Sequence, residues 1–281
     1  MIGVFDSGHG GLTVLRALVR ELPERGFVYL GDNAHAPYGD RTPEDIYRLT
    51  LACLERLFGF GCRLVVVACN TAAAIGLRRL QQTWLPLHHP DRRVIGVLVP
   101  MVEAVTGVPW MAEIEAGRHR GEPRTVAVFA TRLTVQSGAF VHEIRKRAAE
   151  ITVVQQACPA LVRLIEQAAP LAQLRPAVQH YTAELMETLN AIPPSAAILG
   201  CTHYPLVQNL FAEALPNGVE LLSQPEITAK SLAAYLVRHP EFDRADGQPI
   251  RFYTSGPAAK VSELASRFYG ETLEFRPLPP A

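Results

Sequence analysis

Two segments of this chain, far apart in the sequence, follow the same plan. Residues 64–71 read LVVVACNT and residues 196–203 read AAILGCTH, so each is an apolar run that ends at a cysteine and continues into polar residues and a helical pattern. A buried strand that leads into a helix is the repeating unit of parallel α/β sheets. A looser pair, residues 4–8 and 128–131, also leaves an apolar run for a small polar loop. This repetition predicts two similar α/β halves that face each other.

The rest of the chain continues this alternation. We expect strands at 2–5, 27–30, 64–68, 94–97, 125–129, 151–154, 196–199, 220–222 and 250–253. We expect helices at 12–22, 43–59, 71–84, 100–107, 134–149, 158–168, 171–190, 205–215, 226–238 and 257–269. The predicted fold class is α/β, with two pseudo-symmetric, doubly wound parallel sheets and an inserted surface excursion at 108–124. Ligands bind such sheets at the carboxyl ends of the strands, where both repeated segments place their cysteine.

The composition excludes several classes of protein. The chain has 281 residues, 48% hydrophobic and 19% charged, enough to bury the core of one large domain or two ordinary ones. Lysine plus arginine and aspartate plus glutamate both number 27, and no basic run resembles a nucleic-acid footprint. We find no apolar stretch of about 18 residues and no signal-peptide pattern, so we expect neither a membrane span nor secretion. Five cysteines in such a chain indicate reduced thiols and a cytoplasmic protein.

The cysteines fall into two groups. Cys53, Cys62 and Cys158 have no acid–base partner beside them, and buried cysteine commonly behaves as a small hydrophobe, so we interpret them as structural. Cys69 and Cys201 instead leave a strand where the chain becomes polar. Hydroxyl groups and the amides of a new helix can stabilise a thiolate at such a position. We therefore interpret the second group as functional.

A pair of cysteines on facing halves suits one kind of chemistry best. An unperturbed thiol titrates near ~8.5, so a modest shift makes it an acid or a base near neutral pH. Inversion of a carbon stereocentre requires removal of a proton from one face and delivery to the other, which a thiolate and a thiol on either side can perform. A hydrolase with one cysteine oriented by His203 is an alternative, but it leaves Cys69 unexplained.

Two polar loops follow the first two predicted strands. The glycines of DSGHGG at 6–11 allow close backbone approach to an anionic group, although the spacing is not that of a phosphate loop. Asp6 contacts either a substrate ammonium or a catalytic thiol, or it caps a tight turn. In the loop at 30–39, Tyr38 and the backbone of Gly39 either bind a carboxylate or, for Tyr38, pack at a domain seam.

The sequence predicts no bound cofactor. We find no P-loop, no dinucleotide-binding fingerprint and no lysine context typical of pyridoxal phosphate. His88 and His89 are adjacent, so they do not share one face of a helix or strand, and the other histidines are scattered. We therefore expect no metal site.

Six motifs occur in one order along the chain. They are DSGHGG at 6–11, YLGDNAHAPYG at 29–39, VVACNTAAA at 66–74, ATRLTVQSGAF at 130–140, ACPALVRLIE at 157–166 and LGCTHYPL at 199–206. The two cysteine motifs are highly specific when they occur together. With these motifs the chain resembles the glutamate racemases, isomerases of the aspartate/glutamate racemase superfamily, over residues 2–269 apart from the excursion.

The resemblance implies a catalytic set of four residues. Cys69 and Cys201 would be the acid–base groups on opposite faces of the substrate α-carbon, with Cys69 acting on the D-enantiomer and Cys201 on the L-enantiomer. Asp6 would assist Cys69, and His203 would assist Cys201. The substrate-binding positions would be Ser7, Pro37, Tyr38, Gly39, Asn70, Thr71, Thr131, Glu166 and Thr202, with Thr134 and Ser137 in the same loop as Thr131.

The resemblance also implies a fold and a role. The family racemises glutamate without a cofactor and supplies D-glutamate for peptidoglycan, hence for cell-wall biogenesis and cell shape in bacteria. Homodimers are usual in it. The active site would lie in the cleft between two α/β domains, a discontinuous one of residues 1–98 plus 210–281 and a second of residues 99–209.

Three positions depart from the family pattern. His9 stands where a small aliphatic residue is common, His35 where arginine is common, and Leu222-Ser223 replaces a usual Asp-Ser pair. Aspartate racemases usually carry a GGMGP-like first loop and Cys-Thr-Glu at the second cysteine, so the Cys-Thr-His of this chain favours the glutamate branch. A racemase of aspartate or another amino acid, and a non-catalytic amino-acid-binding relative, are the alternatives.

Overall fold

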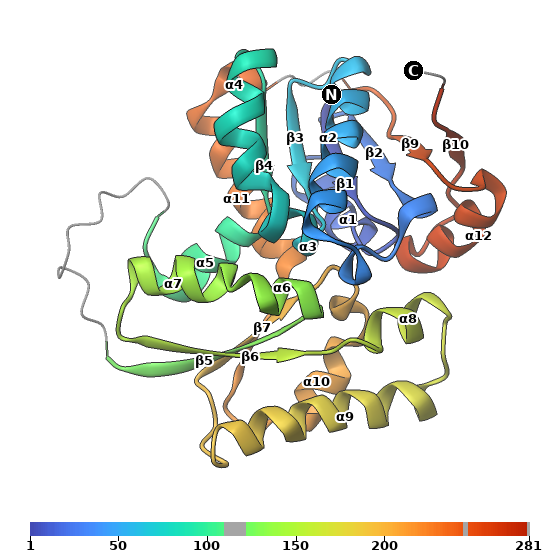
Figure 1. Cartoon of the computed structure of the whole chain (residues 1–281). Coiled ribbons are helices and arrows are strands. Elements are labelled where there is room, and N and C mark those ends of the chain that lie inside the picture. Colours follow the sequence, from blue (N-terminus) through green and yellow to red (C-terminus); the bar gives the residue numbers. More distant parts are fainter. Residues whose placement is uncertain (110–121, 244–246, 280–281) are drawn as a thin grey trace.

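The chain folds into two lobes, each built on one parallel sheet (Figure 1). The computed structural model describes residues 1–109, 122–243 and 247–279. Every strand pairing within the two sheets is parallel. The predicted class, α/β with two parallel-sheet halves, is therefore confirmed.

Helices cover the sheets and connect the lobes. They are α1 (Leu12–Glu21), α2 (Pro43–Gly59), α3 (Asn70–Ala72), two π-helical segments (Ala73–Leu77 and Leu80–Trp84), α4 (Leu85–His88), α5 (Leu98–Thr106), α6 (Arg132–Ser137), α7 (Ala139–Arg147), α8 (Leu161–Glu166), α9 (Leu171–Thr188), α10 (Gln208–Ala214), α11 (Gln224–Arg238) and α12 (Ala258–Tyr269). Short 3-10 turns lie at η1 (Asn33–His35), η2 (Tyr38–Asp40), η5 (Tyr204–Val207) and η6 (Pro240–Phe242). One predicted helix, 134–149, is wrong in its extent. Gly138 adopts a left-handed φ of 63° and separates α6 from α7.

The first lobe holds a six-stranded sheet in the order β10-β9-β2-β1-β3-β4. Its strands are β1 (Ile2–Asp6), β2 (Phe27–Gly31), β3 (Leu64–Val67), β4 (Arg93–Gly96), β9 (Arg251–Thr254) and β10 (Phe275–Pro277). All but β10 lie at predicted positions. Val4 and Val66 face the helix α1 side of the sheet, whereas Phe5 and Val67 face α2, so both faces are buried, as is usual for parallel sheets.

The second lobe holds a four-stranded sheet in the order β6-β5-β7-β8. Its strands, β5 (Arg124–Ala130), β6 (Ile151–Ala157), β7 (Ala196–Gly200) and β8 (Glu220–Leu222), also lie at predicted positions. Val126 and Val128 pack in one buried cluster with residues of α5 and α7, whereas Phe129 and Leu199 pack with residues of α9 and α10. Alternate side chains therefore bury both faces of this sheet as well.

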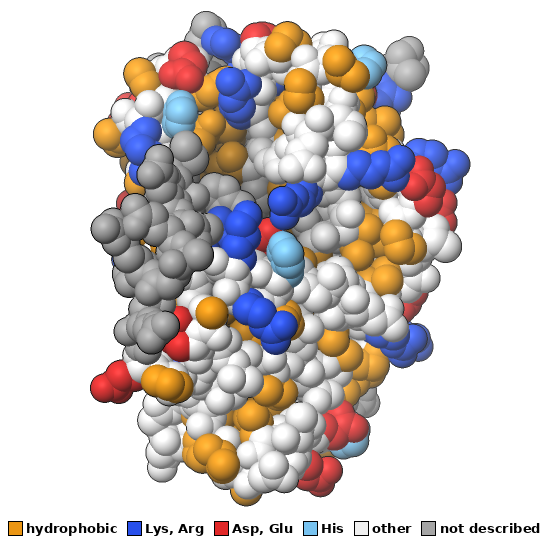
Figure 2. Space-filling view, turned by 60° about the vertical axis from the view of Figure 1, so that its left-hand side comes forward, with side chains coloured by type: hydrophobic (Ala, Val, Ile, Leu, Met, Phe, Trp, Pro, Cys, Tyr) orange, Lys and Arg blue, Asp and Glu red, His pale blue; other side chains and the backbone are white. Residues whose placement is uncertain are grey.

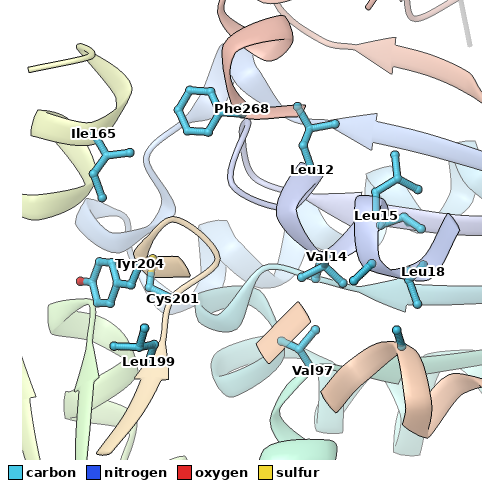
Figure 3. Packing of buried hydrophobic residues seen from close by; sticks show 14 of the residues in the cluster. Leu12, Val14, Leu15, Leu18, Val97, Ile165, Leu199, Cys201, Tyr204 and Phe268 are labelled. Atoms are coloured by element: carbon cyan, nitrogen blue, oxygen red, sulfur yellow. The ribbon is translucent and has the colours of Figure 1, made fainter. Parts of the chain in front are cut away.

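One buried cluster runs through both lobes. It includes Leu12 and Leu15 of α1 in the first lobe and Leu199 and Tyr204 in the second, and Figure 3 shows them on either side of Val97. Helix α11 also packs against both α1 and α5. The two lobes therefore share apolar contacts.

The strand positions refine the predicted domain boundaries. β8 pairs with β7 in the second sheet, whereas the prediction assigns 210–281 to the first domain. We therefore propose that the chain returns to the first domain after residue 222, where α11 begins. Of the predicted excursion at 108–124, residues 110–121 lie outside the described residues.

The face at the left of Figure 1 comes forward in Figure 2. Lys and Arg side chains there form small separate groups, with uncharged, acidic and hydrophobic side chains between them. The described residues of this face form no continuous basic stripe of the kind that follows a phosphate backbone. Within the described ranges, no helix is long and apolar enough to cross a membrane.

Candidate active site

A cavity of about 320 Å³ is bordered by residues of both lobes that follow the carboxyl ends of strands. The first lobe contributes the predicted residues Ser7, Pro37, Tyr38, Gly39, Cys69, Asn70 and Thr71. The second lobe contributes the predicted residues Thr131, Glu166, Cys201, Thr202 and His203. Asp6 is fully buried behind this wall. The fold thus gathers residues from distant motifs around one cavity.

Cys69 makes its direct contacts with a hydroxyl group and a backbone N–H. It caps α3, where its Sγ accepts a hydrogen bond from the Ala72 N–H at 3.5 Å, and its thiol donates to Ser7 Oγ at 3.3 Å. Burial raises the pKa of Cys69 to about 12, and the nearby Asp6 carboxylate adds to this shift. Cys69 is therefore a protonated thiol at neutral pH.

Asp6 is the last residue of β1, and its side chain contacts residues of both lobes. Its Oδ2 accepts a hydrogen bond from the Gly8 N–H at 3.0 Å, and its Oδ1 accepts one from Thr202 Oγ1 at 3.4 Å. Burial raises the pKa of Asp6, although the positive charge of His203 opposes this. Asp6 therefore stabilises the turn after β1, and its carboxylate also raises the pKa of Cys69, whereas its part in catalysis stays a prediction.

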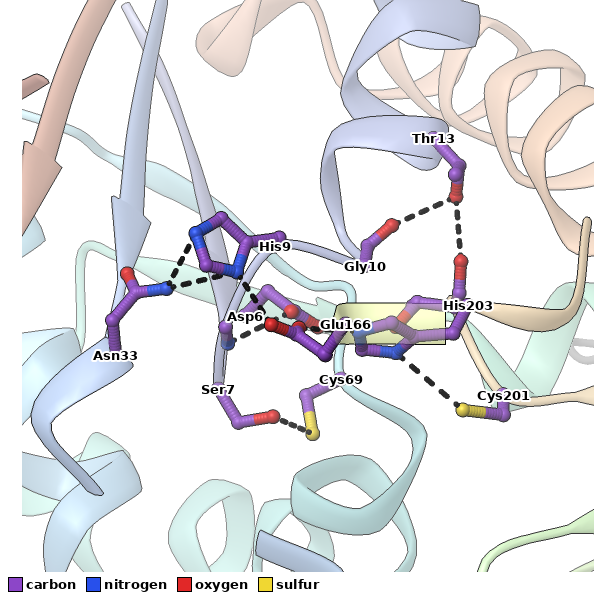
Figure 4. Close-up of polar contacts among 12 residues, drawn as sticks. Asp6, Ser7, His9, Gly10, Thr13, Asn33, Cys69, Glu166, Cys201 and His203 are labelled. Atoms are coloured by element: carbon purple, nitrogen blue, oxygen red, sulfur yellow. Dashed lines mark hydrogen bonds and ion pairs between the residues drawn. The ribbon is translucent and has the colours of Figure 1, made fainter. Parts of the chain in front are cut away.

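Cys201 stands at the end of a chain of ionisable groups (Figure 4). Its Sγ is 3.8 Å from His203 Nδ1, and His203 Nε2 is 2.7 Å from Glu166 Oε1. The other oxygen of Glu166, Oε2, is 2.9 Å from His9 Nδ1. In the described parts of the chain, no group of three or more His, Cys, Asp or Glu side chains is arranged to hold a metal ion.

Within this series of ionisable groups, Glu166 is negatively charged and His203 is positively charged. Burial alone would raise the pKa of Glu166, but hydrogen bonds from His203 and His9 outweigh it, and the pKa lies well below its usual range. Burial would likewise lower the pKa of His203, but its contacts with Cys201 and Glu166 raise it well above its usual value. A carboxylate and an imidazolium therefore pair beside Cys201.

Three threonine hydroxyls meet where the lobes approach each other. Thr71 Oγ1 lies 3.1 Å from Thr131 Oγ1 and 3.4 Å from Thr134 Oγ1, so the contact joins the first lobe to the second. Thr131 also caps α6, because its Oγ1 accepts a hydrogen bond from the Thr134 N–H at 3.3 Å. Ser137 instead donates to the Thr134 carbonyl oxygen. Thr71 and Thr131 thus present hydroxyl groups to the cavity.

The loop after β2 is held by a buried aspartate. Tyr38 Oη donates to Asp32 Oδ2 at 2.7 Å, and Asp32 Oδ1 accepts from Ser255 Oγ at 2.6 Å and contacts His35 Nδ1 at 2.8 Å. The hydroxyl of Tyr38 is therefore occupied, and its side chain is 1% exposed. Any contact of this loop with a ligand carboxylate would use backbone amides, such as that of Gly39.

Several site residues were not predicted. Arg132, Arg163 and Cys158 border the cavity, although Cys158 was interpreted as purely structural. Gln224 exchanges two buried hydrogen bonds with Asn70, at 2.6 and 2.7 Å, and so holds the segment after Cys69 against α11. Arg132, Cys158 and Arg163 lie within motifs quoted above, at 130–140 and 157–166, so these motifs could have indicated them. Gln224 has no local signal, because its role comes from a contact with a distant segment.

Three comparisons with known proteins find similar sequences and structures. The family model of the Asp/Glu/Hydantoin racemases matches residues 2–232. A glutamate racemase of Phenylobacterium zucineum is 47% identical over 281 residues, which cover 98% of this chain and 99% of that protein. A glutamate racemase of a Caulobacter species is 46% identical, with 98% of each chain covered.

Solved structures give the same result. Glutamate racemase RacE1 of Bacillus anthracis superimposes with a TM-score of 0.85 at 30% identity, covering 99% of this chain and 97% of that one. The glutamate racemase of Francisella tularensis, in complex with D-glutamate, gives a TM-score of 0.81 at 26% identity, covering 100% of this chain and 96% of that one. An aspartate racemase of Picrophilus torridus, at 13% identity and a TM-score of 0.51, shares the fold alone.

Proposed function

This chain belongs to the Asp/Glu/hydantoin racemase family, and we propose that it interconverts L- and D-glutamate without a cofactor, with Cys69 and Cys201 as the two acid–base groups. The observation that carries the proposal is that Cys69 of the first lobe and Cys201 of the second, each buried and directly after the carboxyl-terminal part of a strand, border the same cavity. Glutamate as the substrate is supported by relatives that are named glutamate racemase and that match nearly the whole chain. The supply of D-glutamate for peptidoglycan, a cytoplasmic location and a homodimer stay predictions from the resemblance.

The environments of the two sulfurs support a direction for each proton. In conversion of L- to D-glutamate, the thiolate of Cys201 takes the α-proton, and the thiol of Cys69 gives its own proton to the opposite face of the carbanion. The reaction ends with a thiol at Cys201 and a thiolate at Cys69, which is the state that the reverse reaction requires. His203, held protonated by Glu166, stabilises negative charge on Cys201 before the transfer.

The cavity also offers groups for the substrate's charges. Thr71, Thr131 and Thr202 border it with hydroxyl groups, and backbone amides after β1 and β2 can bind carboxylates. Arg132 and Arg163 border it without an ion-pair partner among the described residues, so they favour entry of an anionic amino acid. Because the α-proton of a free amino acid is far less acidic than a thiol, positioning and exclusion of water must supply most of the rate.

The test is proton exchange in heavy water with several amino acids. The protein should place deuterium at the α-carbon of glutamate and produce the opposite enantiomer, as followed by NMR and polarimetry. Aspartate and glutamine, in both enantiomeric forms, serve as comparison substrates. Racemisation of aspartate alone would replace glutamate as the substrate, and binding without any exchange would identify a non-catalytic relative.

A further inference from the structure

His9 contacts Glu166 at the opposite end of the series of ionisable groups from Cys201, and it is not among the residues that border the cavity. It is 5% exposed, and its Nδ1 contacts Glu166 Oε2 at 2.9 Å. His9 comes from the first lobe and Glu166 from the second, so this contact crosses between the lobes. Phe268 of α12 stacks on the His9 ring at 5.5 Å and meets the His203 ring edge-on at 5.9 Å. These rings restrict the orientation of both histidines.

The contacts of His9 show which ring nitrogen donates to Glu166. The Thr254 hydroxyl accepts from the Gly256 N–H at 2.9 Å and donates to Asn33 Oδ1, also at 2.9 Å. The amide nitrogen of Asn33 therefore faces the His9 ring, 3.3 Å from Nε2 and 3.4 Å from Nδ1. A carboxylate can only accept a hydrogen bond, so the nitrogen that faces Glu166, Nδ1, is the donor in that contact. Figure 4 shows His9 between Asn33 and Glu166.

We propose that His9 is a positioning residue for the Cys201 half of the reaction, an inference that rests on the proposed racemisation. His9 holds one oxygen of Glu166, which keeps the other oxygen on His203 Nε2 and directs His203 Nδ1 at Cys201. Without it, one oxygen of the partly buried carboxylate loses its donor, and the carboxylate becomes free to rotate away from His203.

Two substitutions at this position test the proposal. His9→Val removes the donor, whereas His9→Asn retains one, because the side-chain nitrogen of asparagine occupies nearly the place of the histidine Nδ1. We expect His9→Val to lower kcat by roughly 10- to 100-fold, the effect of one hydrogen bond to a charged group, with KM changed less than about threefold. His9→Asn should restore most of the rate. His180→Val is the matched control, because His180 makes an exposed pair with Glu184 at 3.4 Å on α9, away from the cavity.

A double-mutant cycle separates this role from general packing. In a Glu166→Gln background, His9→Val should cause no further loss of kcat, because its effect passes through the carboxylate. If the losses of kcat in His9→Val and Glu166→Gln multiply in the double variant, the proposal is overturned. A His9→Val enzyme as fast as the wild type would also overturn it.

A measurement that needs no turnover separates failure of this inference from failure of the proposed function. The NMR titration of the His203 ring should move to lower pH in His9→Val and stay near the wild-type curve in His9→Asn. An unchanged titration in His9→Val would refute the positioning role even in an active enzyme. A wild-type protein that racemises no amino acid would refute the proposed function, and the titration would still decide whether His9 acts on His203.

Discussion

The two cysteines occupy equivalent places in the two lobes but have different surroundings. Cys69 contacts the Ser7 hydroxyl and a backbone N–H, whereas Cys201 contacts His203, which is paired with Glu166. The first sulfur is kept as a thiol by burial, and the second is placed beside a positive charge. The comparison shows that a repeated strand–cysteine–helix plan fixes where each sulfur lies, while different side chains around it decide how each sulfur holds a proton. His203 is only two residues from Cys201, but Ser7 and Glu166 come from distant segments.

Thermodynamics limits how this difference can be observed. Because two enantiomers have equal free energy, the equilibrium constant is one, and any variant must change kcat/KM by the same factor in both directions. A defect on one side of the site therefore shows itself in kcat and KM separately, in isotope effects, or in exchange without racemisation. The predictions that follow use these quantities to separate the Cys69 side from the Cys201 side.

The largest effect should follow removal of either sulfur. Cys69→Ala and Cys201→Ala should each lower the rate of racemisation by on the order of a thousandfold or more, because neither remaining group can serve both faces. Polarimetry with L-glutamate measures the loss. Cys62→Ala is the control, since Cys62 is buried in the first lobe and does not border the cavity. A Cys62→Ala enzyme as inactive as the other two would assign the losses to folding.

Loss of the supporting groups should separate the two sides next. His203→Asn should lower kcat by roughly a hundredfold, because it removes the positive charge beside Cys201. Ser7→Ala should lower it by less than about tenfold, because Cys69 keeps its proton through burial and retains the Ala72 N–H. Steady-state kinetics in both directions gives the comparison. Equal losses for the two variants would show that the environments do not differ in function.

A smaller and purely steric disturbance should act on the Cys201 side alone. A Cβ at Gly10 would lie 2.4 Å from Thr202 Oγ1 and 2.5 Å from His203 Nδ1, so Gly10→Ala must displace the imidazole. We expect kcat to fall by about tenfold or more while circular dichroism stays native. The control is Gly59→Ala, where nothing lies within 4 Å of the new Cβ. Unchanged kinetics in Gly10→Ala would indicate that the exact place of His203 is unimportant.

The smallest expected effect is a difference between the Cys69 side and the Cys201 side in how stability depends on pH. The pKa of His203 is raised on folding, so its stabilisation is complete below the unfolded value of ~6.5 and is lost as the pH rises through the folded value. The pKa of Cys69 is raised to about 12, so its contribution is lost later, between ~8.5 and that value. Glu166, with a lowered pKa, contributes above ~4.3 and loses this as the pH falls.

Two variants separate these pH ranges when the free energy of unfolding is measured with denaturant at several pH values. Relative to the wild type, His203→Asn should remove the stability change that begins above ~6.5, and Cys69→Ala should remove the one that begins above ~8.5. For Cys69 the change should reach about 2 kcal/mol in the free energy of unfolding by about pH 10. A wild-type curve that runs parallel to that of His203→Asn throughout this range would contradict the charged state assigned to His203.

The sequence anticipated the parts of the site that are encoded locally. The strand ends that carry Cys69 and Cys201 could be located because apolar runs stop there, and the resemblance supplied the polar residues around them. The contact between His9 and Glu166 could not be foreseen, since the two lie 157 residues apart and meet only when the lobes pack. The pairing of Gln224 with Asn70, 154 residues apart, has the same origin.

Errors in the predicted elements also have physical causes. The strand β10 is three residues long and ends in Pro277, so it has no apolar alternation to mark it. The predicted helix at 134–149 overlooked that Gly138 can adopt a left-handed conformation. The hydroxyl of Tyr38 donates to Asp32, a partner that the sequence did not indicate, and the carboxylate contact of this loop stays a prediction.

The most direct test of the whole account is α-proton exchange by the two single-cysteine variants in heavy water. Cys69→Ala should incorporate deuterium into L-glutamate and leave D-glutamate unlabelled, while Cys201→Ala should label D-glutamate alone, and neither should convert one enantiomer into the other. Rapid racemisation by either variant, or labelling of both enantiomers by one of them, would contradict the assignment of one sulfur to each face of the substrate.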